Sequence, residues 1–359
     1  MKARHSGDLS SVEAVQSSIE RLDPGWLTAE RFDYAVREAK EFDRRYPPRA
    51  WLPSLAGLPM LADELLAIGY EGLADRGNRL PGALNSLRVE GALLVGFFRS
   101  HSSGAEDSLP GISQADATKE VVVDPAVKAL RCGAVAASAA LDHCGSTIIR
   151  GFHGYDGYRP TLGLAPALGL RGTATVTFVA STLREQAFLL DRLRAAGVLG
   201  DPRFLPHSNP KSLTSFVASP LAPSKVMVLR VSDGLAEHRR DPNDPLGAAV
   251  SILTAKHIEY EVVDLDGHLL SPVDSEPESA DQMQALIVAI DELVGSVDLL
   301  AFDLVNDPIV RQMKLGRLWC LAELANLPMV VLADAGVALV GARFGDARLL
   351  RMAAFVADS

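Results

Sequence analysis

The fold of this chain is decided by the stretch from Asp142 to Gly163, which reads DHCGSTIIRGFHGYDGYRPTLG. Glycine, tyrosine and proline punctuate it, and such punctuation favours a loop. Ser146 follows a glycine near its start, and an alanine-rich run over Ala126–Leu141 precedes it. Alanine has high helix propensity, so we predict a helix over Ala126–Leu141 and a loop from Asp142 to Gly163.

Composition narrows the class of protein. The 359 residues are 48% hydrophobic and 22% charged, which excludes a disordered or collagen-like chain. The net charge of −10 argues against a nucleic acid or an anionic membrane as partner, because both require clustered positive charge. The longest apolar run is too short to span a bilayer. We therefore expect a soluble protein.

Cysteine usage and the N-terminal sequence predict the compartment. Cys132, Cys144 and Cys320 are scattered, and the first residues lack the apolar region of a signal peptide. We expect reduced thiols and a cytoplasmic location. No CxxC pair or HxxxH cluster is present, and we expect neither a metal nor a cofactor.

Predicted helices and strands alternate along most of the chain. A capping box, Ser10 with Glu13, predicts a first helix. Further helices are expected over 29–45, 183–195, 248–257, 282–294 and 346–356, and strands over 92–96, 174–179, 226–231, 260–263, 299–304, 329–332 and 337–340. Residues 53–59 are expected to form a loop leading into a helix. This alternation indicates βαβ units and a parallel or mixed sheet.

Five segments, in order along nearly the whole chain, resemble the amidase signature family. They are 7–13, 55–60 (similar to L-x-G-[VI]-P), 91–96 (similar to G-A-x-x-x-G-K), 142–163, and the closing pair 327–328 with 340–350. Within the fourth, Gly157–Gly163 fits G-[LY]-[KR]-P-T-x-G residue for residue. The resemblance implies an α/β fold with a central, twisted, mixed β-sheet flanked by helices on both sides. It implies one domain over 1–359 and hydrolysis of a carboxamide through an acyl-enzyme. The proline- and serine-rich stretch 201–224 is a candidate loop or boundary.

The family's catalytic residues can be placed on this sequence one by one. Its nucleophile is a serine, which a second serine and an unprotonated lysine activate. Ser146 matches the nucleophile. The turn that opens at Asp142 would bind the oxyanion through the backbone N–H groups of His143, Cys144, Gly145 and Ser146.

The positions of the other two family members hold different residues. The lysine position, six residues after the glycine of L-x-G-[VI]-P, is Asp63. The relay-serine position falls in Lys119–Asp124, which has neither serine nor glycine. A shifted alignment would bring Ser113 or Thr118 nearer, but the glycine turn would still be missing. Removing members of a hydrolytic triad costs on the order of 10⁴- to 10⁶-fold in rate. We therefore predict a divergent, shortened member that lacks the Ser-Ser-Lys triad.

Other side chains are candidates for the same cleft. His101, His143 and His153 lie in segments that line it in the family, and a histidine could replace the lysine as base. Arg150 would replace the family's arginine near the nucleophile, two places late. Tyr155 would form part of the wall.

Three functional hypotheses follow. The first is a protein that binds a small amide- or carboxyl-bearing ligand in the amidase cleft, or performs altered chemistry on it. The second is an active amidase or acyltransferase in which Asp63 or a histidine assists Ser146. The third is a non-catalytic partner subunit. A homodimer is the default oligomeric expectation.

Overall fold

The strands form two hydrogen-bonded mixed sheets. The computed structural model describes residues 9–47, 52–64, 66, 82–99, 124–142, 147, 154–165, 175–196, 212–232, 247–266, 288, 291–303 and 325–358. The five-stranded sheet has the order β1 (Ala29–Glu30), β3 (Ala92–Phe98), β2 (Leu58–Asp63), β4 (Ala137–Asp142), β6 (Thr175–Ala180). In it, β2 runs parallel to both β3 and β4, while β1 and β6 are antiparallel to their neighbours.

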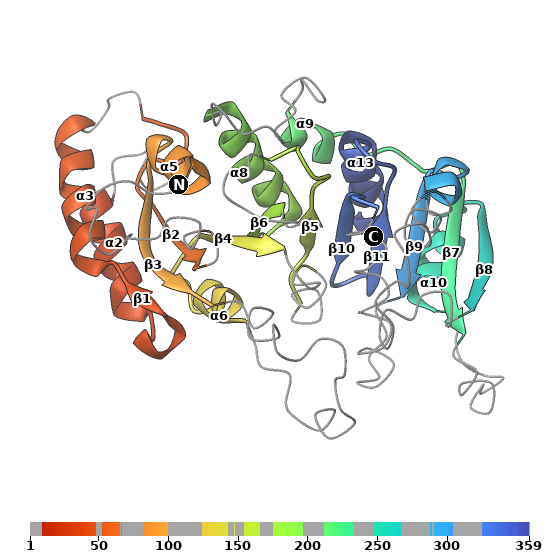
Figure 1. The fold of residues 1–359 in the computed structure, drawn as a ribbon, viewed down its shortest axis with the longest axis horizontal. Coiled ribbons are helices and arrows are strands. Elements are labelled where there is room, and N and C mark those ends of the chain that lie inside the picture. The colour runs from red at the N-terminus through yellow and green to blue at the C-terminus, as the bar shows by residue number, and fades with distance from the viewer. Residues whose placement is uncertain are drawn as a thin grey trace.

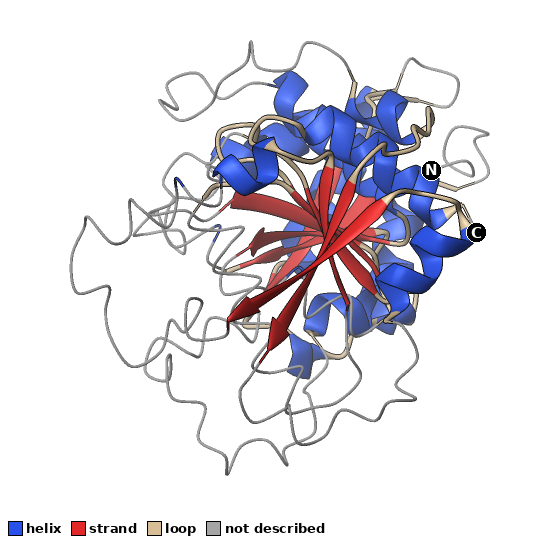
Figure 2. Cartoon of the chain, turned by 90° about the vertical axis from the view of Figure 1, so that its right-hand side faces the viewer, coloured by secondary structure: helices blue, strands red, loops and turns tan. Residues whose placement is uncertain are grey.

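The six-stranded sheet carries the C-terminal half of the chain. Its order is β5 (Gly157–Arg159), β10 (Met329–Leu332), β11 (Val337–Val340), β9 (Leu299–Asp303), β7 (Val226–Ser232), β8 (Tyr260–Asp266). Strand β7 is parallel to β8 and β9, and the remaining pairs are antiparallel. Its edge strand β5 lies beside β6, the edge strand of the first sheet (Figure 1). The strands fan out in a strong twist with helices on both sides (Figure 2). The predicted mixed α/β class is confirmed.

Helices cover both faces of the sheets. Helices α2 (Ser11–Arg21), α3 (Phe32–Arg45) and α6 (Pro125–Arg131) contribute to one apolar cluster with the five-stranded sheet. On the opposite face, a larger cluster joins residues of both sheets to α5 (Gly82–Val89), α8 (Leu183–Ala196), α9 (Leu213–Val217), α10 (Ala248–Ala255) and α13 (Asp346–Ala357). A 3₁₀ turn spans Pro24–Trp26. The two sheets therefore share a hydrophobic core.

Most predicted elements are present, and the capping box predicted at the start of α2 is formed. In the capping box of α2, Ser10 Oγ accepts the Glu13 N–H at 3.1 Å and Glu13 accepts the Ser10 N–H at 2.7 Å. The helix predicted over 29–45 begins only at Phe32, because Ala29–Glu30 pairs with β3. Of the candidate boundary at 201–224, residues 201–211 lie outside the described part, and the rest contains the short helix α9.

The helix predicted over Ala126–Leu141 is wrong. The helix ends at Arg131, Gly133 turns the chain with a φ of 68°, and Ala137–Asp142 forms a strand. This strand lies between β2 and β6, and its alanines are buried on both faces. Tertiary burial outweighs helix propensity in such a central strand. The loop expected at 53–59 ends earlier than predicted, because the buried strand β2 begins at Leu58. The loop expected over Asp142–Gly163 contains strand β5.

Candidate functional site

The candidate site lies where parallel strands end. Asp63 is the last residue of β2, with Phe98, the last residue of β3, opposite it in the ladder. On the other side of β2, strand β4 ends at Asp142. Parallel strands put their carboxyl ends at one edge of a sheet, which is where open α/β sheets bind ligands. Asp63 and the carboxyl end of β4 therefore belong to the same edge.

Asp63 is completely buried. Side chains alternate along a strand, so Asp63 lies on the same face as Leu61, which packs into the cluster under α2, α3 and α6. Burying a carboxylate in apolar surroundings is costly unless partners offset it. Asp63 is thus a short acidic side chain held within the protein, and its assignment to the family's lysine position remains a prediction.

A charged pair crosses the ends of β2 and β3 next to Asp63. The Glu64 carboxylate accepts a hydrogen bond from Nε of Arg99, and the Glu64 N–H donates to the Phe98 carbonyl at 2.8 Å. The hydrogen bond to Glu64 raises the pKa of the Arg99 guanidinium, and the charges of Glu64 and Asp63 add to the effect. The edge therefore carries two carboxylates and one exposed cation, and residue patterns had indicated only Asp63.

The segment that carries the candidate nucleophile is anchored at its two described ends. Ser146, His143, Cys144, Gly145 and Arg150 lie outside the described residues, as does His101. The backbone of Asp142 ends β4, and Thr147, directly after Ser146, is buried. The roles of the candidate residues outside the described part remain the predictions made above.

Thr147 is pressed against the start of β5. A Cβ atom added to Gly157 would lie 2.6 Å from Thr147 Cγ2 and 2.9 Å from the Thr147 carbonyl oxygen. Only glycine permits so close an approach without displacement. The glycine that opens the best-matching motif therefore touches the residue next to Ser146.

Tyr155 is half-buried, and its ring lies 5.5 Å from the Arg131 guanidinium carbon of α6. The ring packs against the cluster under α2, α3 and α6, which is the face on which Asp63 lies. Tyr155 thus belongs to the same layer as Asp63. Its contact with substrate remains a prediction.

A buried carboxylate joins two of the quoted motifs. Asp346, the first residue of α13, is 1% exposed. Its Oδ1 accepts the Tyr158 hydroxyl at 2.7 Å and the Thr161 N–H at 2.9 Å, and its Oδ2 accepts the Thr161 hydroxyl at 2.6 Å. Burial raises the pKa of Asp346, opposed by these three donors. Both motifs match in order along the chain, but the sequence pattern assigned no role to Asp346 or Thr161.

Among the helices that the structure describes, none has the length and apolarity that crossing a membrane would require.

No protein-family model and no curated protein matches the sequence. Solved structures do match it. A bacterial aryl acylamidase of the amidase signature enzymes family superposes with a TM-score of 0.72 at 15% identity, over 99% of this chain and 94% of that one. The peptide amidase from Stenotrophomonas maltophilia superposes with a TM-score of 0.69 at 16% identity, over 99% of this chain and 94% of that one. The 6-aminohexanoate cyclic dimer hydrolase superposes with a TM-score of 0.68 at 16% identity, over 99% of this chain and 94% of that one. This chain has the amidase signature fold.

Proposed function

We propose that this chain is a divergent amidase signature protein that has lost Ser-Ser-Lys amide hydrolysis. It keeps the amidase cleft for a small ligand that bears an amide or a carboxyl group, which it binds or transforms by altered chemistry. The observation that carries the proposal is Asp63, a buried carboxylate at the end of β2, where the family's motif spacing requires lysine. The shared fold and the five motifs support the placement of the cleft.

The chemistry explains why this exchange matters. A serine hydroxyl is a weak nucleophile near pH 7 and needs a base within hydrogen-bond reach. An aspartate side chain is much shorter than a lysine side chain, and its charge has the opposite sign. The sequence that aligns with the relay position, Lys119–Asp124, offers no hydroxyl to bridge the difference. The two family residues that move the proton, the relay serine and the lysine, are therefore both replaced.

A ligand-binding experiment tests the retained cleft. Small primary amides and short carboxylic acids are titrated into the protein, with the thermal midpoint as readout. A ligand that binds only the folded state raises that midpoint with concentration. We expect at least one ligand class to do so, and we expect Asp63→Asn to weaken the shift.

The matched control is Asp303→Asn. Asp303 also ends a strand, β9 in the six-stranded sheet, where its Oδ1 accepts the Ala249 N–H at 2.7 Å. This variant should retain the ligand-dependent shift. If neither ligand class stabilises the unmodified protein, or if both variants lose the shift equally, the proposed cleft is wrong.

One observation favours a second candidate, a working enzyme with a rebuilt site. Burial makes a carboxylate more basic, and Asp63 is buried at the edge where β4 leads toward Ser146. In this case Ser146 would attack an amide or ester while Asp63 or a histidine takes its proton. Covalent labelling of Ser146 by a fluorophosphonate distinguishes the candidates. Labelling that Asp63→Asn abolishes supports the enzyme, and absence of labelling supports the first proposal.

A further inference from the structure

The hydrogen bonds of Asp346 join α13 to strand β5 and to the chain that follows β5. Its three donors come from Tyr158 in β5 and from Thr161 two residues after that strand. Thr161 Oγ1 also accepts the N–H of Phe344, at 3.1 Å, in the turn before α13. Phe344 adopts a left-handed φ of 59°, which is uncommon outside glycine. The start of α13 and the chain after β5 are thus clamped together.

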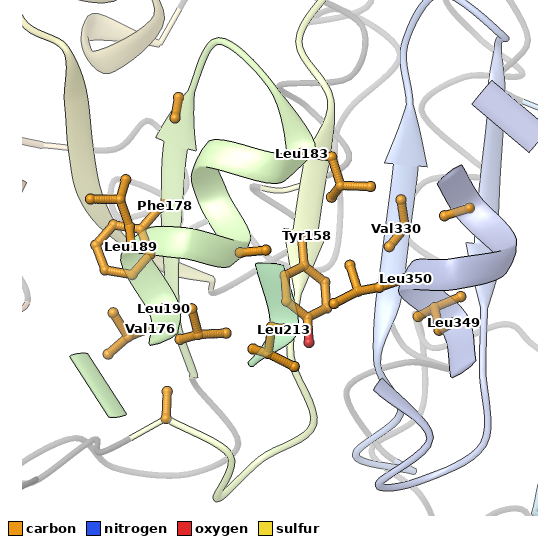
Figure 3. Close-up of a cluster of buried hydrophobic side chains, with 14 of the residues drawn as sticks. Tyr158, Val176, Phe178, Leu183, Leu189, Leu190, Leu213, Val330, Leu349 and Leu350 are labelled. Carbon is orange, nitrogen blue, oxygen red and sulfur yellow. The ribbon is translucent and has the colours of Figure 1, made fainter. Parts of the chain in front are cut away.

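This clamp acts on a short strand that is also held by a hydrogen bond from Arg159 to the Leu327 carbonyl oxygen. β5 has three residues and lies at the edge of the six-stranded sheet, where its ladder partner is β10. The ring of Tyr158 is buried between leucines of α8 and Leu350 of α13 (Figure 3). The hydroxyl of that ring donates to Asp346, so the same side chain joins β5 to α13 by packing and by a hydrogen bond.

The other end of β5 meets the candidate nucleophile segment. Gly157 lies so close to Thr147 that a methyl group would not fit between them. Thr147 is buried, and it follows Ser146 directly in the sequence. A displacement of β5 would therefore change the space that Thr147 occupies.

We propose that Asp346 is a positioning residue for Thr147, the residue that follows Ser146 in the sequence. It acts through Tyr158 and Thr161, which fix β5, and through Gly157, which fixes Thr147. The relevance of this path to function rests on the proposed cleft around Ser146. The mechanical path itself stands on the contacts given above.

Hydrogen exchange measured by mass spectrometry on the full chain tests the path without any substrate. Asp346→Asn keeps the size of the side chain but sets an amide group against one of the donors. We expect peptides that span Thr147 and Gly157 to exchange about tenfold faster in this variant, because buried donors lose their acceptor. Thr161→Val should act in the same direction.

The matched control is Asp191→Asn. Asp191 in α8 is 6% exposed and accepts four hydrogen bonds from Ser212, Leu213 and Thr214 at the start of α9, at 2.5–2.9 Å. This control should loosen α9 but leave the peptides around Thr147 unchanged. Faster exchange around Thr147 in Asp346→Asn alone supports the proposal. Unchanged exchange there, or equal exchange in the control, overturns it.

A milder variant covers the case in which Asp346→Asn does not fold. Tyr158→Phe removes one donor and leaves both bonds from Thr161. A smaller increase in exchange around Thr147 is then expected, and its absence contradicts the proposal. Because exchange requires no amide chemistry, this result is independent of whether Ser146 hydrolyses anything.

Discussion

The hydroxyl of Tyr158 donates a 2.7 Å hydrogen bond to Oδ1 of Asp346, a residue 188 positions further along the chain. Both side chains are almost fully buried. Burial raises the pKa of Tyr158 well above its ordinary value, and the charge of Asp346 raises it further. The phenol therefore stays protonated and remains a donor. This bond joins the two motifs by which the sequence resembles the amidase signature family.

The first prediction concerns the strength of this bond. Tyr158→Phe should lower the free energy of unfolding by about 1–2 kcal/mol, because one net hydrogen bond is lost and a buried acceptor loses a donor. Urea denaturation of the single variants and of Tyr158→Phe with Asp346→Asn gives the interaction energy. An interaction energy of zero in this double-mutant cycle would contradict a direct interaction.

The second prediction concerns pH. Burial raises the pKa of Asp346 above that of an unfolded aspartate, which is about 3.9. The folded state therefore retains a proton that the unfolded state has already released. The resulting stabilisation is complete below the unfolded pKa and is lost as pH rises through the folded pKa. The stability of the unmodified protein relative to Asp346→Asn should fall as pH rises from about 4 toward 7.

Urea denaturation of both proteins at several pH values measures that difference. Most other titrating groups contribute equally to the two proteins and cancel. A difference that grows with pH would show that the donors from Thr161 and Tyr158 outweigh burial and hold the pKa down.

The third prediction concerns the contact between β5 and Thr147. Gly157→Ala should destabilise the protein by about 1–3 kcal/mol, since the new methyl group would overlap Thr147 Cγ2 and the Thr147 carbonyl oxygen. The control is Gly295→Ala, where nothing lies within 4 Å of the added Cβ. That substitution should be neutral or stabilising by up to about 1 kcal/mol. Equal denaturation midpoints for the two variants would contradict the close approach of Gly157 to Thr147.

The fourth prediction concerns the exposed pair at the candidate site. Arg99→Ala should leave the urea denaturation midpoint almost unchanged, since ion pairs open to solvent contribute little. A clearly lower midpoint would mean that Arg99 compensates the buried charge of Asp63. Glu64→Gln, which removes the other half of the pair, should have a similarly small effect.

Sequence patterns predicted the fold class because motif order and hydrophobic alternation both report on the chain as a whole. Strands β3, β7 and β11 are apolar runs of the expected length, and their positions were predicted closely. The strand at Ala137–Asp142 was missed because alanine favours helices locally. Its strand conformation depends on β2 and β6, which are distant in the sequence.

The role of each candidate site residue stays a prediction. Motif spacing led to Asp63, and the structure adds that this residue is buried at a sheet edge. Asp346 carried no local signal, because its partners lie about 185 residues away and such a contact has no spacing rule. The Arg99–Glu64 pair was missed for the same reason, since it depends on the parallel pairing of two strands.

We propose above that Ser-Ser-Lys hydrolysis has been lost. The most direct measurement is the rate of hydrolysis of a panel of small amides by the unmodified protein and by Ser146→Ala. We predict that both proteins show the same background rate. Robust hydrolysis by the unmodified protein that disappears in Ser146→Ala would contradict this loss.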